Sequence, residues 1–117
     1  MDIESIRLYF LSQKASSEGT PFGDDVLVFK VLDKMFGTMS LKGPVRINLK
    51  CDPEHALELR EQYEYVIPGN HMNKKHWNTI ENLDMVPSKL IKEWIDGSYQ
   101  LVVKGMKKND RLSLESD

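Results

Sequence analysis

The pattern of apolar and polar positions predicts three helices. Asp2 is a candidate N-cap, and apolar residues at mixed helical spacing follow it, so the first helix should run to about Gln13. Asp52, Pro53 and Glu54 form a strong helix start, which predicts a second helix as far as about Tyr63. The third helix opens at Pro87, and its apolar residues recur every three or four positions: Leu90, Ile91, Trp94, Ile95, Tyr99, Val102 and Met106. Gly97 lies inside this helix and leaves room for a kink.

Shorter apolar runs between the helices predict strands. Val26–Leu32 and Lys34–Leu41 are rich in apolar residues and are joined at Leu32-Asp33, which suggests a tight hairpin. Residues 45–51 alternate strictly, so one face of this strand should be buried and the other wet. The wet face carries Arg46 and Lys50, and Lys30 of the first run is a candidate to join them.

The remaining segments complete the predicted fold. Residues 15–23 contain Ser, Gly and Pro and are expected to be a loop, and residues 107–117 are polar and expected to fray. Residues 70–83 predict a second hairpin with Asn73-Lys74-Lys75 near its tip. The order α-β-β-β-α-β-β-α predicts an α+β fold, in which an antiparallel sheet has its helices packed on one face. We expect a single domain over residues 1–111 and a disordered tail at 112–117.

Composition and charge narrow the classes of function. The chain has 117 residues, is 40% hydrophobic and carries a net charge of −2, which argues against a strongly cationic nucleic-acid-binding protein. The charge is uneven, because residues 1–70 hold 8 Lys and Arg against 11 Asp and Glu, while residues 71–111 hold 8 against 5. This asymmetry is compatible with a local basic patch and equally with chance.

No motif for catalysis, a metal or a cofactor stands out. The histidines His55, His71 and His76 lack metal-binding motifs, and a structural role is favoured for Cys51, because Asp52 beside it opposes thiolate formation. We therefore expect no enzyme activity, no metal and no cofactor. A single cysteine, no N-terminal signal pattern and no long apolar run predict a cytoplasmic protein without a membrane partner.

The most unusual segment is His71–Thr79, which combines lysines, histidines, amides and an indole. Lys74 and Lys75 could neutralise phosphates, and Asn73, His76 and Asn78 could make polar contacts, although Asn78 could instead satisfy backbone groups. For Trp77, packing in the core is favoured over stacking on a base, whereas for the two lysines a solubilising turn and a binding role stay equally open. A second basic cluster lies near the end of the last helix and consists of Lys104, Lys107, Lys108 and Arg111. Favourable interaction of these cations with the helix dipole suffices to explain the cluster, but it could also extend a binding surface.

These residues resemble the MmcQ/YjbR family of small bacterial proteins. The resemblance runs from about residue 21 to 108, and the block His71–Thr79 is its most specific part. One departure is Gly69-Asn70, where an aromatic residue is expected. The other matching motifs are Pro21-Phe22-Gly23, Val28-Phe29-Lys30-Val31, Lys34-Met35-Phe36, Lys50-Cys51-Asp52-Pro53-Glu54, Ser98-Tyr99 and Lys107-Lys108.

The resemblance implies a CyaY/frataxin-like fold and a double-wing DNA-binding role, which the family carries by analogy to a phage transcription activator. Iron chemistry of the frataxin kind is not supported, since the first helix offers only Asp2 and Glu4 as acids. Our leading hypothesis is weak, salt-dependent DNA binding by the open sheet face and the second hairpin. The alternative is a protein-interaction or small-ligand-binding domain that uses the same face. The candidate DNA contacts are Asn73, Lys74, Lys75, His76, Asn78, Lys30, Arg46, Lys50, Lys107 and Lys108.

Overall fold

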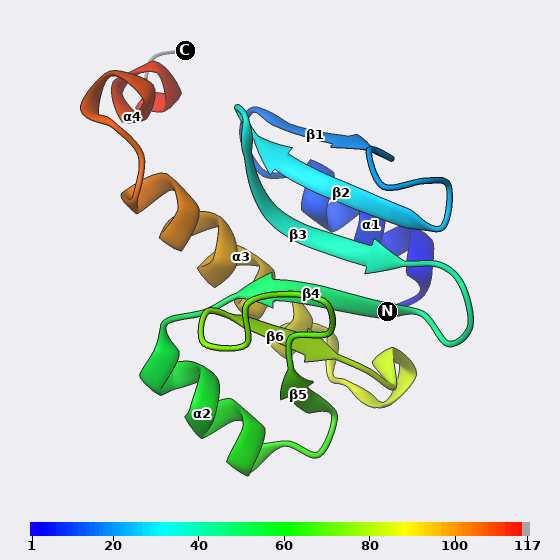
Figure 1. Cartoon of the computed structure of the whole chain (residues 1–117). Coiled ribbons are helices and arrows are strands. Elements are labelled where there is room, and N and C mark those ends of the chain that lie inside the picture. The colour runs from blue at the N-terminus through cyan, green and yellow to red at the C-terminus, as the bar shows by residue number, and fades with distance from the viewer. Residues whose placement is uncertain (116–117) are drawn as a thin grey trace.

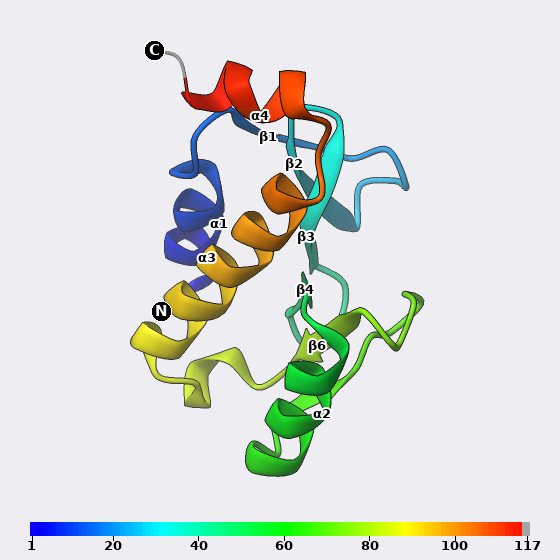
Figure 2. The ribbon, with the colours of Figure 1, turned by 90° about the vertical axis from the view of Figure 1, so that its left-hand side faces the viewer.

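The structure, a computed structural model, describes residues 1–115 and forms two layers. In chain order its elements are α1 (Ile3–Leu11), β1 (Ser16–Gly19), β2 (Val26–Val31), β3 (Lys34–Ser40), β4 (Arg46–Lys50), α2 (Pro53–Gln62), β5 (Val66–Pro68), β6 (Trp77–Ile80), a 3₁₀ turn (Leu83–Met85), α3 (Ser88–Lys104) and α4 (Lys108–Glu115). The strands form one antiparallel sheet in the order β1-β2-β3-β4-β6-β5. Helices α1 and α3 lie on the same face of this sheet (Figures 1 and 2). The predicted α+β class with helices on one face is therefore confirmed.

Two short edge strands differ from the predicted elements. Residues 16–19 were expected to be loop, yet they pair with β2 as the edge strand β1. The sequence predicts the second hairpin at 70–83, but its first arm is β5, and residues 70–76 belong to the connection. β1 has no apolar alternation, and β5 is only three residues long. Backbone hydrogen bonding to a neighbouring strand forms them, and period-2 patterning does not report this.

The C-terminal prediction also needs correction. Residues 108–115 form helix α4 instead of a frayed segment, and Leu114 on it is buried among the core residues. One apolar side chain at the correct turn of a short helix is enough to attach it to the domain. The part of the predicted tail at 116–117 lies outside the described residues.

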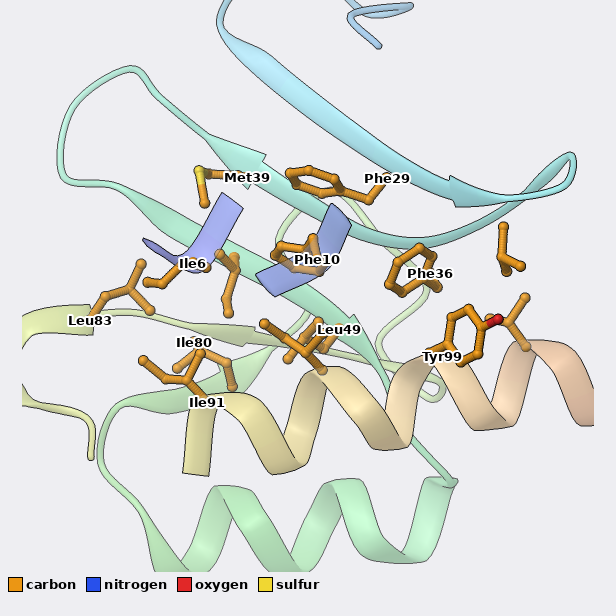
Figure 3. Close-up of a cluster of buried hydrophobic side chains, with 14 of the residues drawn as sticks. Ile6, Phe10, Phe29, Phe36, Met39, Leu49, Ile80, Leu83, Ile91 and Tyr99 are labelled. Atoms are coloured by element: carbon orange, nitrogen blue, oxygen red, sulfur yellow. The ribbon is translucent and has the colours of Figure 1, made fainter. Parts of the chain in front are cut away.

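A β-bulge shapes the core between the sheet and α1. Phe29 pairs with Gly37 and Lys30 with Met35, so Phe36 is the extra residue on β3. Phe36 and Gly37 consequently both face the helices. The missing side chain of Gly37 leaves space for the ring of Phe10, which stacks on Phe29 with centroids 4.1 Å apart (Figure 3).

Helix α3 is fixed to the sheet by both apolar and polar contacts. Ile91 and Ile95 are fully buried, and the ring of Tyr99 meets Phe36 edge to face at 5.4 Å (Figure 3). The hydroxyl of Ser98 donates to the carbonyl of Phe36 at 2.6 Å and accepts from the backbone N–H of Lys50 at 2.9 Å. The helix is continuous through Gly97, so the break that the sequence allows at this residue does not occur.

Candidate nucleic-acid interface

The sheet face turned away from α1 and α3, here called the open face, has a polar row at its centre. Thr38 pairs with Asn48, and Asn48 pairs with Thr79. The carboxamide of Asn48 donates to the hydroxyl of Thr38 at 3.0 Å, and the hydroxyl of Thr79 donates to the carboxamide oxygen of Asn48. All three side chains are buried. Because each is hydrogen-bonded to its neighbour, the row holds three strands in fixed register.

The charges on the open face have one sign. Strand alternation gives this face three cations, Lys30, Arg46 and Lys50, all half-buried. The only acid in the six strands of the described chain is Glu18, which points to the other face and accepts a hydrogen bond from Arg7 of α1 at 2.8 Å. The strand residues of the open face are Ser17, Gly19, Val26, Val28, Lys30, Met35, Thr38, Ser40, Arg46, Asn48, Lys50, Ile67, Trp77 and Thr79.

Two loops rise beside this face. The connection of β1 to β2 (residues 20–25) and that of β5 to β6 (residues 69–76, here the β5–β6 loop) project on the side away from α1 and α3 (Figure 2). Phe22 in the first loop is 72% exposed. The two loops therefore flank the open face.

Hydrogen bonds within the β5–β6 loop use several of the predicted contact groups. The side-chain oxygen of Asn73 accepts from the backbone N–H of Lys75 at 2.9 Å, and the ammonium of Lys74 donates to the carbonyl of Gly69 at 2.8 Å. The backbone N–H of Asn70 donates to Thr79 on the open face at 2.8 Å. Asn73 and Lys74 thus shape the loop, whereas the side chain of Lys75 is exposed.

Asn78 is not a surface contact residue, and the alternative that its side chain satisfies backbone groups is confirmed. Asn78 is buried on the helical side of β6, where its carboxamide oxygen accepts from Nε of Arg60 at 2.7 Å and its amide donates to the carbonyl of Ala56 at 3.3 Å. Arg60 also donates to the backbone carbonyls of Lys74 and Trp77. The sequence does not indicate this role of Arg60, because nothing in a linear pattern reports a contact 14 to 18 residues away.

Trp77 is buried, as the sequence favoured, but not in the main core. It pairs with Lys50 on the open face and is only 9% exposed. The β5–β6 loop lies against it so closely that a Cβ on Gly69 would stand 2.9 Å from the Cβ of Trp77. Its indole is therefore not available as a stacking platform, and His76 beside it is half-buried.

The second basic cluster is remote from the loop. Lys107 precedes α4 and Lys108 begins it, and both views show α4 at one end of the molecule, separated from the β5–β6 loop (Figures 1 and 2). The two clusters do not merge into one surface. Four of the candidates lie on the side of the open face, and their charged groups make no hydrogen bond within the described chain: Lys30, Arg46, Lys50 and Lys75.

The titratable groups give no sign of a reactive centre. Burial, and then the carboxylate of Asp52, raise the pKa of the Cys51 thiol to about 11, which keeps it protonated and poorly nucleophilic near neutral pH. Among residues 1–115, no group of three or more His, Cys, Asp or Glu side chains is arranged to hold a metal ion. None of the described helices is both long and apolar enough to cross a lipid bilayer.

Comparisons with known proteins agree on the fold. Protein DR2400 of Deinococcus radiodurans, which carries domain DUF419, superposes with a TM-score of 0.88 over 98% of this chain and 88% of its own, at 38% identity. A Pseudomonas syringae protein superposes with a TM-score of 0.76 over 87% of this chain and 99% of its own, at 26% identity. The names of these two proteins state no activity.

Sequence comparison identifies the family. Protein YbdF of Escherichia coli O157:H7 is 40% identical over 92 residues, which span 78% of this chain and 75% of YbdF. Protein YjbR of Escherichia coli K12 is 29% identical over 104 residues, 88% of each chain. The model of the YjbR family matches residues 11–101. The resemblance carried by His71–Thr79 is thereby confirmed, and the chain belongs to the YjbR family.

Proposed function

We propose that this protein binds DNA through the open face of its sheet, with the β5–β6 loop at the margin of the contact. One observation carries the proposal. The strand positions of the open face contribute Lys30, Arg46 and Lys50 and no acidic residue, in a chain whose overall charge is negative. A local concentration of cations on a net anionic protein favours an anionic partner at that surface.

The contacts are expected to go to phosphates more than to bases. Lys30, Arg46, Lys50 and Lys75 supply the charge, while Lys74 is already bonded to Gly69 and Asn78 is buried. With Trp77 covered, no aromatic face of the described strands is free to stack on a base. Binding should therefore be sequence-tolerant, weak and strongly dependent on salt.

A polar polyanion suits this face better than an apolar protein partner. Protein-binding surfaces usually present a contiguous apolar patch at their centre. The large apolar side chains that are exposed within residues 1–115 all lie outside the strands. The centre of the open face is the hydrogen-bonded row of Thr38, Asn48 and Thr79.

The test is a fluorescence-anisotropy titration with labelled duplex and single-stranded DNA at about 20 mM salt, where phosphate contacts are strongest. The probe variant is Arg46→Gln/Lys50→Gln. The matched control is Lys107→Gln/Lys108→Gln, which removes the same charge at the far end of the molecule. We expect the first pair to weaken binding about tenfold and the control pair to change it by less than about twofold.

Two results would overturn the proposal. One is the absence of binding to both duplex and single-stranded DNA at low salt. The other is an equal loss of affinity in the two double variants, because that would reflect net charge and not the open face. If single-stranded DNA alone is bound, the open face remains the interface and the substrate class changes.

A further inference from the structure

A concave site lies on the helical side of the sheet, away from the open face. It is a cleft of about 580 Å³ between α2 and α3 above β4 and β6, within the roughly 300–1,000 Å³ typical of small-molecule sites. Its residues lie on both helices and both strands: Leu49, Lys50, Cys51, Asp52, His55, Leu59, Gln62, Tyr63, Asn78, Ile80, Leu90, Glu93, Trp94, Gly97, Ser98 and Leu101.

The cleft exists because α3 has two apolar stripes and only one is covered. Ile91, Ile95 and Val102 are buried against the sheet. The neighbouring stripe of Leu90, Trp94, Gly97 and Leu101 turns toward α2 and lines the cleft, and its three large side chains are only half-buried. At one end the ring of Tyr63 meets Trp94 edge to face at 5.3 Å, which supports that end of the wall.

Gly97 points to an occupant. It lies in the middle of α3, where glycine costs about 1 kcal/mol relative to alanine. Neither backbone conformation nor packing requires glycine there, since its φ is not positive and a Cβ would meet nothing within 4 Å. At Gly37, by contrast, packing explains the glycine, because a Cβ there would lie 2.3 Å from Cε1 of Phe10. At Gly97 no group of the described chain occupies the space that a side chain would fill.

The lining defines the chemistry of that partner. Leu49, Leu59 and Ile80 are buried at the base of the cleft and present an apolar surface. Asp52 and Glu93 line the cleft and are exposed, whereas Lys50, the one Lys or Arg of the lining, turns its side chain to the open face. A negatively charged ligand would face an unfavourable local field.

We propose that the cleft between α2 and α3 binds a small, predominantly apolar molecule that carries no negative charge and lies against the backbone of α3 at Gly97. The proposal is independent of DNA binding, because the site is on the other face of the sheet. Burying an apolar ring against Leu49, Leu59 and Ile80 supplies the favourable free energy. The bare helix at Gly97 permits the close approach that a side chain would prevent.

The test uses two dyes of the same skeleton. N-Phenyl-1-naphthylamine is neutral, and 8-anilino-1-naphthalenesulfonate is the same molecule with a sulfonate. Both brighten in apolar surroundings, and binding is titrated at pH 8 from dye emission. The probe variant is Gly97→Phe, which fills the cleft, and the control is Gln100→Phe, which adds the same ring at an exposed position of α3 outside the cleft.

We expect the neutral dye to bind at least about fivefold more tightly than the sulfonate, and Gly97→Phe to weaken it by at least about tenfold. Gln100→Phe should leave it within about twofold of the unchanged protein. Near-ultraviolet circular dichroism of each variant excludes dye binding to a loosened fold. No binding of the neutral dye, or equal binding to both phenylalanine variants, would refute the proposal.

A measurement on the unchanged protein avoids any effect of substitution on folding. Intermolecular nuclear Overhauser effects should connect the neutral dye to the indole of Trp94 and the methyl groups of Leu101. Contacts only to residues outside the cleft, such as the exposed Phe22 or Met85, would place the dye elsewhere and overturn the assignment.

Discussion

Arg60 and Asn78 lie 18 residues apart in the chain, and Nε of Arg60 donates a 2.7 Å hydrogen bond to the carboxamide oxygen of Asn78. Through this bond, and through its contacts with the carbonyls of Lys74 and Trp77, one helix residue positions both β6 and the β5–β6 loop. The arrangement connects the helical side of the molecule to the margin of the open face.

Replacing Arg60 should therefore destabilise the fold. Arg60→Met leaves the buried oxygen of Asn78 without a donor, a loss of about 1–3 kcal/mol in the free energy of unfolding. Urea titration measures it, with Arg111→Met as an exposed control expected to change stability by less than about 0.5 kcal/mol. Equal effects of the two changes would show that the Arg60 contacts do not matter.

Gly37 should tolerate no side chain. Gly37→Ala brings a Cβ to 2.3 Å from Cε1 of Phe10, whose ring is held by Phe29. We expect a destabilisation of about 1–3 kcal/mol, the usual range for overpacking. In a double-mutant cycle with Phe10→Leu, the combined variant should lose less than the sum of the single changes. Strict additivity would mean that the clash with Phe10 is not the cause.

Ala15 should be improved by glycine. Its φ of 61° lies in the left-handed region, and its side chain is exposed. Ala15→Gly relieves about 1–2 kcal/mol of backbone strain and loses about half of that to unfolded-chain entropy. Thermal unfolding should show a net stabilisation. The reciprocal change Gly43→Ala, at φ 74° with open space around the Cβ, should destabilise. The same sign for both changes would contradict this account.

Cys51 should react slowly at neutral pH. Since burial and Asp52 raise its pKa from 9.0 to about 11, thiolate absorbance should appear mainly near that higher pH. Asp52→Asn should lower the midpoint without restoring the ordinary value, because burial is the larger cause. Asp52 makes no side-chain cap bond to α2, so the change should leave that helix intact. A midpoint unchanged in Asp52→Asn would assign the whole shift to burial.

The same pKa shift predicts how stability depends on pH. The folded state keeps the thiol proton more tightly than the unfolded state, so this contribution is fully present below pH 9.0 and is lost as pH rises toward about 11. Cys51→Ser should flatten the decline of the free energy of unfolding in that window. An equally steep decline in the variant would place its origin at other groups, such as Tyr9, whose pKa is raised to about 12.

Salt dependence should report the number of phosphates that the open face engages. With about four cations in contact, log K should fall against log salt with a slope near −3.6. Removing one of them, as in Arg46→Gln, should reduce the magnitude of the slope by about 0.9. Lys107→Gln should leave the slope unchanged. A slope insensitive to Arg46 would exclude that residue from the contact.

Local patterns predicted the elements that have strong patterns of their own. The alternation of residues 45–51 gave the strand β4 and the face on which Arg46 and Lys50 lie, and the apolar spacing from Pro87 gave α3. The sequence did not predict the edge strand β1, because Ser16–Gly19 has no apolar alternation and forms by pairing with β2. It did not predict helix α4 either, because Leu114 is the one buried residue in a polar segment.

The candidate site was predicted only in part. The direction of Lys30, Arg46 and Lys50 follows from strand geometry, which repeats every two residues and is therefore written in the local sequence. The burial of Asn78 and the use of Lys74 within its own loop depend on Arg60 and Gly69, which the fold brings to them. No pattern along the chain reports these pairings.

By itself, then, the sequence determined the fold class, the family and the face to which each residue of β4 points. Only the tertiary structure decided which lysines are free, where Trp77 is covered and that α2 and α3 enclose a cleft beside Gly97. The physical reason is the range of the interactions. Backbone periodicity acts between residues a few positions apart, whereas burial and hydrogen bonding join segments that only the folded chain brings together.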